Sequence, residues 1–137
     1  MRSLGIIGGG QLGMFICQAA KSLGIKTSIF SEIQEFSAKK FCDQYFIGKF
    51  NDNEVLENFI NSADYFTIET ENIPYDILDK IASVKQIFPD PQIVKICQNR
   101  LKEKRFLNSL ENIRTAVYFE INSFKDLEKK ISLINNN

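Results

Sequence analysis

The chain has 137 residues, of which 44% are hydrophobic and 25% are charged, and its 17 basic residues balance its 17 acidic residues. This length suits one ordinary domain with a single core, and a formal charge of zero gives no overall attraction to nucleic acid or to an anionic membrane surface. The chain has no histidine, which excludes histidine acid–base catalysis and histidine metal ligands within it.

The cysteines and the N-terminus favour a cytoplasmic protein. Cys17, Cys42 and Cys97 are odd in number, lie far apart and form no C-x-x-C pattern, which argues against a disulfide framework or a zinc site. No apolar run approaches the length of a membrane span. The residues from Met1 to Ser3 lead directly into a short strand and do not resemble a signal peptide. We therefore expect a protein of the reducing cytoplasm that binds neither nucleic acid nor membrane.

The first half of the chain alternates between strand-like and helix-like patterns. Residues Ser3–Ile7 form the first predicted strand, and apolar residues at helical spacing then extend from Leu12 to Leu23, where Gly24 ends the helix. A second strand is predicted at residues 25–30. Two further strands, at residues 45–47 and 64–68, flank an amphipathic helix that contains Val55, Leu56, Phe59 and Ile60.

The second half continues this alternation. A short helix after Pro74 precedes a strand at residues 86–88, and Asp90 followed by Pro91 is typical of a helix start. We expect that helix to run to about Leu110 and a further strand to follow at residues 115–119. Ser123 with Asp126 forms a variant capping box ahead of a last amphipathic helix, which contains Phe124, Leu127, Ile131 and Ile134.

Alternating strands and helices predict an α/β fold. Such a pattern is typical of a sheet whose two faces are both covered by helices. We therefore expect a three-layer, Rossmann-like domain with a mostly parallel sheet of about five strands.

The segment LGIIGGGQLG at residues 4–13 contains the spacing G-x-G-x-x-G at Gly8, Gly10 and Gly13. It follows a predicted strand and opens a helix, where free backbone N–H groups attract phosphate or another anion. Alternatively, the glycines only allow a tight turn and close helix packing. A dinucleotide site also needs an acid at the end of the second strand, where this chain has Ser31 followed by Glu32. A small NAD-binding module therefore stays an alternative.

Three segments together indicate a particular family. GIIGGGQLG at residues 5–13, IETENIP at residues 68–74 and QNRLKEK at residues 98–104 occur in the order and spacing of 5-(carboxyamino)imidazole ribonucleotide synthases. The chain resembles these ATP-grasp carboxylate–amine ligases of purine biosynthesis over essentially its whole length. The resemblance implies a pre-ATP-grasp version of the Rossmann-like fold. It also implies a reaction in which ATP and bicarbonate form carboxyphosphate, magnesium holds the phosphates, and the amine of 5-aminoimidazole ribonucleotide takes up the carboxyl group.

The resemblance also implies which residues bind the ribonucleotide. We expect Glu69 to accept hydrogen bonds from ribose hydroxyls at the carboxyl end of a strand, and the amides of residues 10–12 to face an open cleft. No catalytic or metal-binding residue is assigned to this chain. The alternative is that Glu69 and Glu71 are ordinary solvated acids beside a proline turn. The complete set of expected substrate-binding residues is Gly10, Gln11, Leu12, Glu69, Glu71 and Asn72.

Arg100 and Lys104 are the expected contacts to ATP phosphates. They lie four residues apart and therefore on one helix face, where like charges repel by roughly 0.2–0.5 kcal/mol unless an anion lies nearby. The resemblance implies that the anion is the nucleotide, and the alternative is a solvated arginine or one paired with Glu103. The chain departs from the family at Thr70, where an aromatic residue is more common, and at Met14, where arginine is common.

The C-terminal segment matches only the entrance to the ATP-grasp region of the family. We therefore expect residues 1–110 to form the substrate-side domain and residues 111–137 to be the start of a truncated ATP-grasp region. ATP and magnesium serve the full-length family, and neither is expected to bind tightly to this chain, which we expect to be inactive by itself. A non-catalytic remnant or interaction domain is a further alternative. The expected partners are the ribonucleotide and either a second copy or the missing ATP-grasp lobe.

Overall fold

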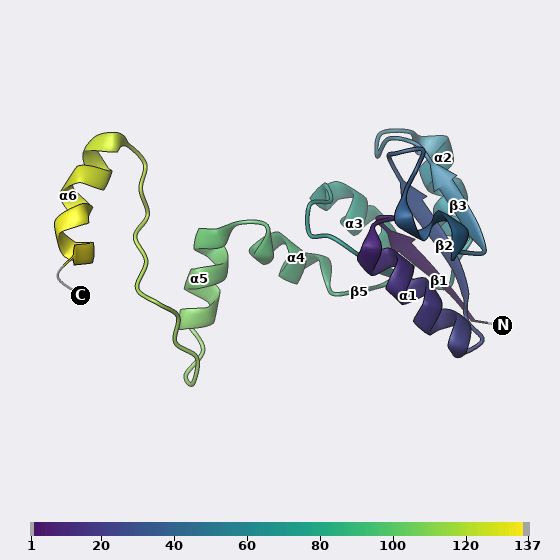
Figure 1. The fold of residues 1–137 in the computed structure, drawn as a ribbon, viewed down its shortest axis with the longest axis horizontal. Helices are drawn as coiled ribbons and strands as arrows, with labels where there is room; N and C mark the ends of the chain where they lie inside the picture. The colour runs from purple at the N-terminus through teal and green to yellow at the C-terminus, as the bar shows by residue number, and fades with distance from the viewer. Residues whose placement is uncertain (1, 136–137) are drawn as a thin grey trace. The chain divides into compact units, whose positions relative to one another are not determined.

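The computed structural model describes residues 2–135, except for the side chains of residues 132–135. The chain divides into two compact units, Met1–Gln98 and Asn99–Asn137, and the first contains a five-stranded sheet (Figure 1). Its strands are β1 (Ser3–Ile7), β2 (Lys26–Ser31), β3 (Gln44–Ile47), β4 (Tyr65–Ile68) and β5 (Gln86–Phe88). Its helices are α1 (Gln11–Ser22), the 3₁₀-helix η1 (Ser37–Lys40), α2 (Asn53–Asn61), α3 (Tyr75–Ala82) and α4 (Pro91–Cys97).

The sheet has the strand order β3-β2-β1-β4-β5, and every neighbouring pair is parallel. The prediction of a mostly parallel sheet of about five strands is therefore confirmed. Because β1 and β4 are neighbours, with Ile7 opposite Ile68, the segments that follow these two strands leave the sheet side by side. Residues about 60 positions apart in the sequence meet at that edge.

Each face of the sheet carries its own hydrophobic core. Phe30, Phe59 and Phe66 meet between the sheet and helices α2 and α3. Ile6 and Cys17 belong to the other core, between the sheet, α1 and η1. Neighbouring strand residues point to opposite faces, so consecutive apolar residues such as those at the end of β1 serve both cores. The predicted three-layer arrangement is thus confirmed, although the sequence patterns did not predict η1.

The chain after residue 90 differs from the prediction in two places. One helix was predicted from Asp90 to about Leu110, but α4 ends at Cys97 and a separate helix, α5 (Arg100–Asn108), follows. The break occurs because the side chain of Asn99 accepts a hydrogen bond from the Lys102 N–H at 3.0 Å and caps the new helix. The strand predicted at residues 115–119 is wrong as well, since no segment among residues 2–135 pairs with that stretch.

The last helix, α6 (Phe124–Asn135), begins where the sequence predicted it. The Ser123 hydroxyl accepts a hydrogen bond from the Asp126 N–H at 3.1 Å, as a capping box requires. The predicted apolar position Ile134 has its side chain outside the described part. Within residues 2–135 no helix is long and apolar enough to cross a membrane.

Candidate functional site at the carboxyl edge of the sheet

The glycine-rich segment forms the turn from β1 into α1. Gly8 has a φ of 105°, a backbone conformation that favours glycine, and its N–H donates to the Phe30 carbonyl of β2 at 3.0 Å. A Cβ atom on Gly13 would lie 2.8 Å from the Gly8 carbonyl oxygen, so glycine there lets α1 start directly against the turn. The predicted strand–turn–helix arrangement is present.

The Glu69 carboxylate lies inside this turn. Glu69 directly follows β4, its N–H donates to the Ile7 carbonyl at 2.9 Å, and its Oε2 accepts a hydrogen bond from the Gly10 N–H at 2.7 Å. A Cβ on Gly10 would lie 2.2 Å from Oε1 of Glu69, and one on Gly8 would lie 2.7 Å from Oε2. The glycines at positions 8 and 10 therefore make room for a carboxylate that belongs to the protein.

This contact changes the expected chemistry of the turn. Helix α1 has no side-chain cap at Gly10 and no acidic residue in its first turn, so Glu69 supplies the negative charge that a helix N-terminus favours. The amides of residues 10–12 were expected to face an open cleft, but the Gly10 amide is already bonded to Glu69. Gln11 and Leu12 follow at the start of α1 and are exposed, Leu12 to 59%.

The turn that contains Glu71 and Asn72 is held in place by a side chain that lies far away in the sequence. Both residues are exposed, and the Asn72 N–H donates to the Thr70 hydroxyl at 3.3 Å. The Gln98 side-chain amide donates to the carbonyls of Glu71 and Ile73, both at 2.7 Å. Gln98 is thus a supporting residue that sequence reasoning missed, although it opens the segment QNRLKEK.

A cavity of about 210 Å³ lies beside the same turn. Gly8, Glu32 and Asn72 are among its lining residues, and the Glu32 carboxylate accepts a hydrogen bond from the Phe50 N–H at 3.3 Å. The Phe50 ring stacks on Phe30, with 5.3 Å between the ring centroids. A dinucleotide site needs a free acid here and free amides in the loop. Because Glu32 and the Gly10 amide are both engaged within the protein, this geometry counts against the NAD-binding alternative.

The expected ATP contacts lie in the second unit, Asn99–Asn137. Arg100 and Lys104 line a cavity of about 380 Å³, together with Tyr118 and Glu120. Arg100 is ion-paired with Glu103, and 74% of the Arg100 side chain is exposed. The paired arginine that sequence analysis left open is therefore present, while both cations still face the cavity.

Only part of an ATP–magnesium site fits these residues. Two cations beside a cavity suit the phosphates of a nucleotide. Magnesium in nucleotide sites is usually held by one or two carboxylates together with the substrate phosphates. Among the side chains that the structure describes, no group of three or more histidine, cysteine, aspartate or glutamate residues could hold a metal ion by itself. The two cations therefore fit nucleotide phosphates, and a magnesium ion here would depend on those phosphates for part of its ligands.

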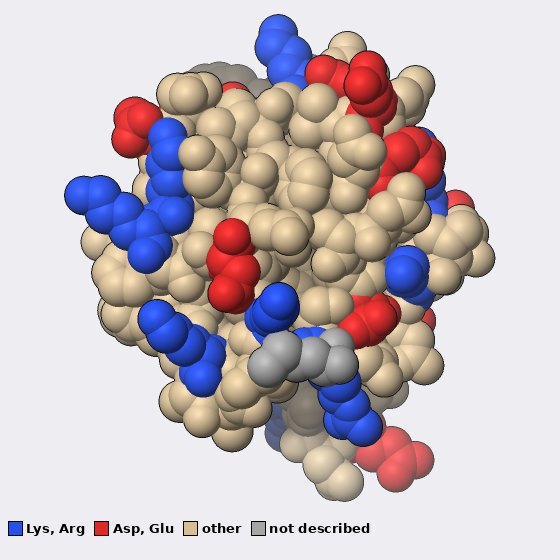
Figure 2. Space-filling model, turned by 90° about the vertical axis from the view of Figure 1, so that its right-hand side faces the viewer, with Lys and Arg blue, Asp and Glu red and all other residues tan. Residues whose placement is uncertain are grey.

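The clearest shifts of pKa lie away from the glycine-rich turn. Burial raises the pKa of the Cys42 thiol to about 11, and burial also raises the pKa of Cys17. Hydrogen bonds from the Ser3 hydroxyl and the Ser3 N–H lower the pKa of Asp64. On the face that Figure 2 shows, the basic and acidic side chains are interspersed with one another.

Comparison with known proteins places this geometry in a family. Residues 1–98 match the model of the ribonucleotide synthetase preATP-grasp domain. The chain belongs to this family. It is 34% identical over 114 residues to the N5-carboxyaminoimidazole ribonucleotide synthase of Brucella melitensis, a match that covers 83% of the chain and 31% of the relative. A bifunctional purine synthesis protein, purC/E, of Dictyostelium discoideum is 36% identical over 132 residues, which cover 96% of the chain and 13% of that protein.

Solved structures agree with this assignment. The N5-carboxyaminoimidazole synthase of Aspergillus clavatus, in complex with ADP and 5-aminoimidazole ribonucleotide, aligns with a TM-score of 0.83 and 28% identity and covers 96% of the chain. The synthetase of Thermus thermophilus aligns with a TM-score of 0.86 and 27% identity. In both cases the match covers 36% of the solved chain. The preATP-grasp chain described here thus spans about a third of the length of these synthases.

Proposed function

We propose that this chain is the N-terminal, substrate-side part of an ATP-dependent carboxylate–amine ligase of purine biosynthesis. The proposed substrates of the whole enzyme are 5-aminoimidazole ribonucleotide, bicarbonate and ATP, with magnesium. The observation that carries the proposal is the hydrogen bond from the Gly10 N–H to the Glu69 carboxylate, which lies next to exposed Gln11 and Leu12. It occurs in a chain of the ribonucleotide synthetase preATP-grasp family. The free thiols of all three cysteines support a reducing, cytoplasmic location.

In this proposal Glu69 binds the sugar of the ribonucleotide. One hydrogen bond, from Gly10, leaves the carboxylate with further acceptor positions, and ribose hydroxyls are suitable donors. A phosphate beside the same carboxylate would be repelled. The ribose end of the ligand therefore lies at the turn, with Gln11 and Leu12 beside it and Glu71 and Asn72 on the facing turn, while its phosphate points away.

Arg100 and Lys104 are the proposed contacts to ATP phosphates. Their charges stabilise the phosphates in the ground state and during phosphoryl transfer. We place the functional boundary of the substrate-side domain near residue 110, with residues 111–137 at the entrance of the ATP-grasp region. Because the chain spans about a third of the synthases that it matches, we expect the 137-residue polypeptide to bind the ribonucleotide weakly, to bind ATP no more tightly, and to have no turnover by itself.

A chimaera tests the function. Residues 1–137 replace the matching N-terminal segment of the Staphylococcus aureus synthase, to which the chain is 27% identical over 132 residues. We expect ATP hydrolysis that depends on 5-aminoimidazole ribonucleotide, and we expect Glu69→Gln to abolish this dependence. The matched substitution Glu54→Gln, on the exposed first turn of α2, should leave it intact. A folded chimaera with equal activity in both variants would contradict the role of Glu69.

The inactivity of the chain alone is tested separately. A steady-state assay contains the 137-residue protein, ATP, magnesium, bicarbonate and the ribonucleotide, and we expect no phosphate release above background. Turnover that disappears in Arg100→Ala would contradict this expectation. Such a result would show that the residues present suffice for the reaction.

A further inference from the structure

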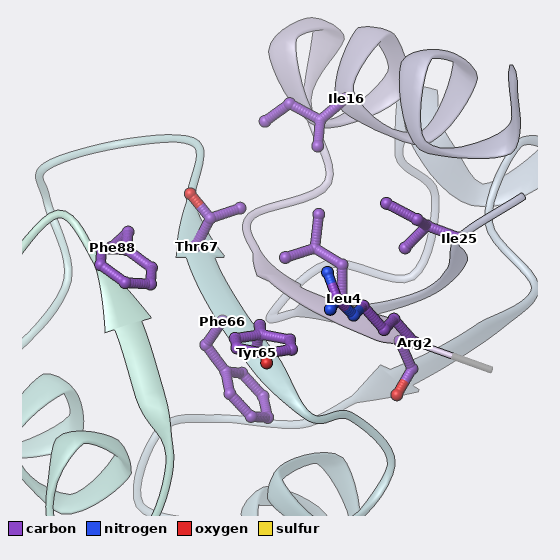
Figure 3. Close-up of a pocket in the computed structure, with 9 residues that line it drawn as sticks. Arg2, Leu4, Ile16, Ile25, Tyr65, Phe66, Thr67 and Phe88 are labelled. Atoms are coloured by element: carbon purple, nitrogen blue, oxygen red, sulfur yellow. The ribbon is translucent and has the colours of Figure 1, made fainter. Parts of the chain in front are cut away.

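The turn between β4 and α3, residues 69–74, is anchored from the side of the sheet where α3 and α4 pack. On the α1 side, β4 and β5 border a largely apolar cavity of about 490 Å³, where Figure 3 shows Thr67 and Phe88 on these two strands and Ile16 of α1 above them. On the opposite side, Ile73 of the turn is buried in the core to which α3 and α4 contribute. The support for the second half of this turn therefore comes from the layer of α3 and α4.

One side chain from that layer joins two carbonyls of the turn. Gln98 directly follows α4, and its side-chain amide donates to the carbonyls of Glu71 and Ile73, both at 2.7 Å. A side-chain amide has two N–H donors, so both donors of Gln98 are used on this one turn. The Ile73 N–H also donates to the Glu71 carbonyl at 2.9 Å. The carbonyls of the residues before and after Asn72 are thus both held in place.

Gln98 can hold the turn because its own backbone is anchored. The Gln98 N–H donates to the Val94 carbonyl at 2.9 Å. Val94 is 2% exposed and belongs to the same hydrophobic core as Ile73. Close-packed cores deform little, so the residue that donates and the turn that accepts keep a fixed separation.

The residue between the two held carbonyls faces the proposed ribonucleotide site. Asn72 is exposed, its N–H donates to the Thr70 hydroxyl at 3.3 Å, and it lines the cavity of about 210 Å³ beside the glycine-rich turn. Groups that are already ordered bind a ligand more tightly than groups that become ordered on binding. We propose that Gln98 is a positioning residue for the ribonucleotide, which acts by holding Glu71 and Asn72 in the arrangement that binds it. This inference rests on the proposed function and adds a determinant of its substrate affinity.

The next residue in the sequence serves the other proposed ligand. The Asn99 side chain accepts a hydrogen bond from the Lys102 N–H at 3.0 Å and caps α5, the helix that contains Arg100 and Lys104. Loss of an N-cap destabilises the first turn of a helix, so Asn99 affects the proposed ATP contacts, whereas Gln98 affects the turn after β4. Substitutions at these two adjacent positions should therefore weaken the binding of different ligands.

Titration of 5-aminoimidazole ribonucleotide into the ¹⁵N-labelled chain tests the proposal. Gln98→Met keeps the length of the side chain and removes both donors. If the turn then has the binding arrangement for about a tenth of the time, the dissociation constant rises about tenfold. The matched control is Gln44→Met, at the exposed first residue of β3, which should bind as the wild type does. Circular dichroism checks that both variants are folded.

The possible outcomes separate this inference from the proposed function. Equal affinity in the wild type and in folded Gln98→Met would overturn the role of Gln98 alone. A wild-type chain that does not bind the ribonucleotide would overturn the role of Gln98 together with the proposed function.

Kinetics of the chimaera with the Staphylococcus aureus synthase distinguish positioning from a general structural role. We expect Gln98→Met to raise the KM for the ribonucleotide about tenfold, with kcat and the KM for ATP within about twofold of the wild-type chimaera. Asn99→Ala should instead raise the KM for ATP, by up to about fivefold. An equal rise of both KM values in Gln98→Met, or a fall in kcat alone, would overturn the proposal.

Discussion

Replacement of Glu69 by alanine measures how far the glycine-rich turn depends on a carboxylate from the neighbouring strand. The change removes the acceptor that lies 2.7 Å from the Gly10 N–H. It also removes the negative charge at the start of α1, where Gly10 offers no side-chain cap and the first turn contains no acid. Water can replace part of the lost bond because Glu69 is only half-buried.

The expected loss follows from these contributions. A hydrogen bond to a charged group contributes about 1.5–3 kcal/mol, and a charge at a helix N-terminus contributes about 0.3–1 kcal/mol. With partial compensation by water, we expect Glu69→Ala to lower the free energy of unfolding by about 2 kcal/mol. Glu69→Gln keeps an acceptor oxygen and should lose about 1 kcal/mol. For a unit of about 100 residues, 1 kcal/mol corresponds to a Tm change of about 4–8 °C.

Urea denaturation at pH 7, followed by far-UV circular dichroism, measures these differences. The order of stability should be wild type, then Glu69→Gln, then Glu69→Ala. Gly10→Ala should also destabilise, because its Cβ would lie 2.2 Å from Oε1 of Glu69 and must displace the carboxylate. The double variant Gly10→Ala with Glu69→Ala should lose less than the sum of the two single losses. A Glu69→Ala protein within about 0.5 kcal/mol of wild type would refute the reasoning.

Three further predictions concern the rest of the first unit. Phe59 is fully buried against three other phenylalanine rings. Its replacement by alanine should lower the free energy of unfolding, measured by urea denaturation, by about 3–5 kcal/mol. Because burial raises the pKa of Cys42 to about 11, little of its thiol is ionised at pH 8, and it should react with a disulfide reagent about 10-fold more slowly than a small-molecule thiol. Stopped-flow absorbance should therefore show exposed Cys97 reacting before half-buried Cys42. Because the pKa of Asp64 is lowered in the folded state by Ser3, its contribution is present above its usual pKa and is lost as pH falls through the folded value. The difference in urea midpoint between wild type and Asp64→Asn should therefore shrink from pH 7 to about pH 3, and a constant difference would contradict this.

The sheet could be predicted from the sequence because each strand is a short apolar run between clear turn residues. Ser3–Ile7 and Gln86–Phe88 are strands at the predicted positions, and Gly24, with a φ of 68°, lies just past the end of α1 as predicted. The break before α5 was missed because the apolar residues keep helical spacing on both sides of Asn99. The capping hydrogen bond of Asn99 depends on the conformation of one side chain, which the spacing does not reveal. The extended stretch at residues 115–119 has a strand-like composition, but a strand also needs a pairing partner.

The position of Glu69 beside the glycine-rich turn was predictable from the sequence, and the hydrogen bond that it makes there was not. Parallel pairing of β1 with β4 brings Glu69 to the glycine-rich turn, and family resemblance pointed to the same residue. The sequence did not predict that its carboxylate would bond the Gly10 amide, because glycine spacing alone is the same whether a loop receives a phosphate or a side chain. The role of Gln98 also depends on a contact across 27 residues of sequence.

Titration of 5-aminoimidazole ribonucleotide into the ¹⁵N-labelled chain, followed by heteronuclear NMR, tests the central claim most directly. We predict a dissociation constant of about 1 mM, with amide shift changes concentrated at residues 8–12 and 69–72 and absent around Val84. We further predict that Glu69→Gln weakens this binding at least about tenfold, while Glu54→Gln does not. Shift changes elsewhere in the first unit, or equal affinity in both variants, would contradict the assignment of the ribonucleotide site to the turn that holds Glu69.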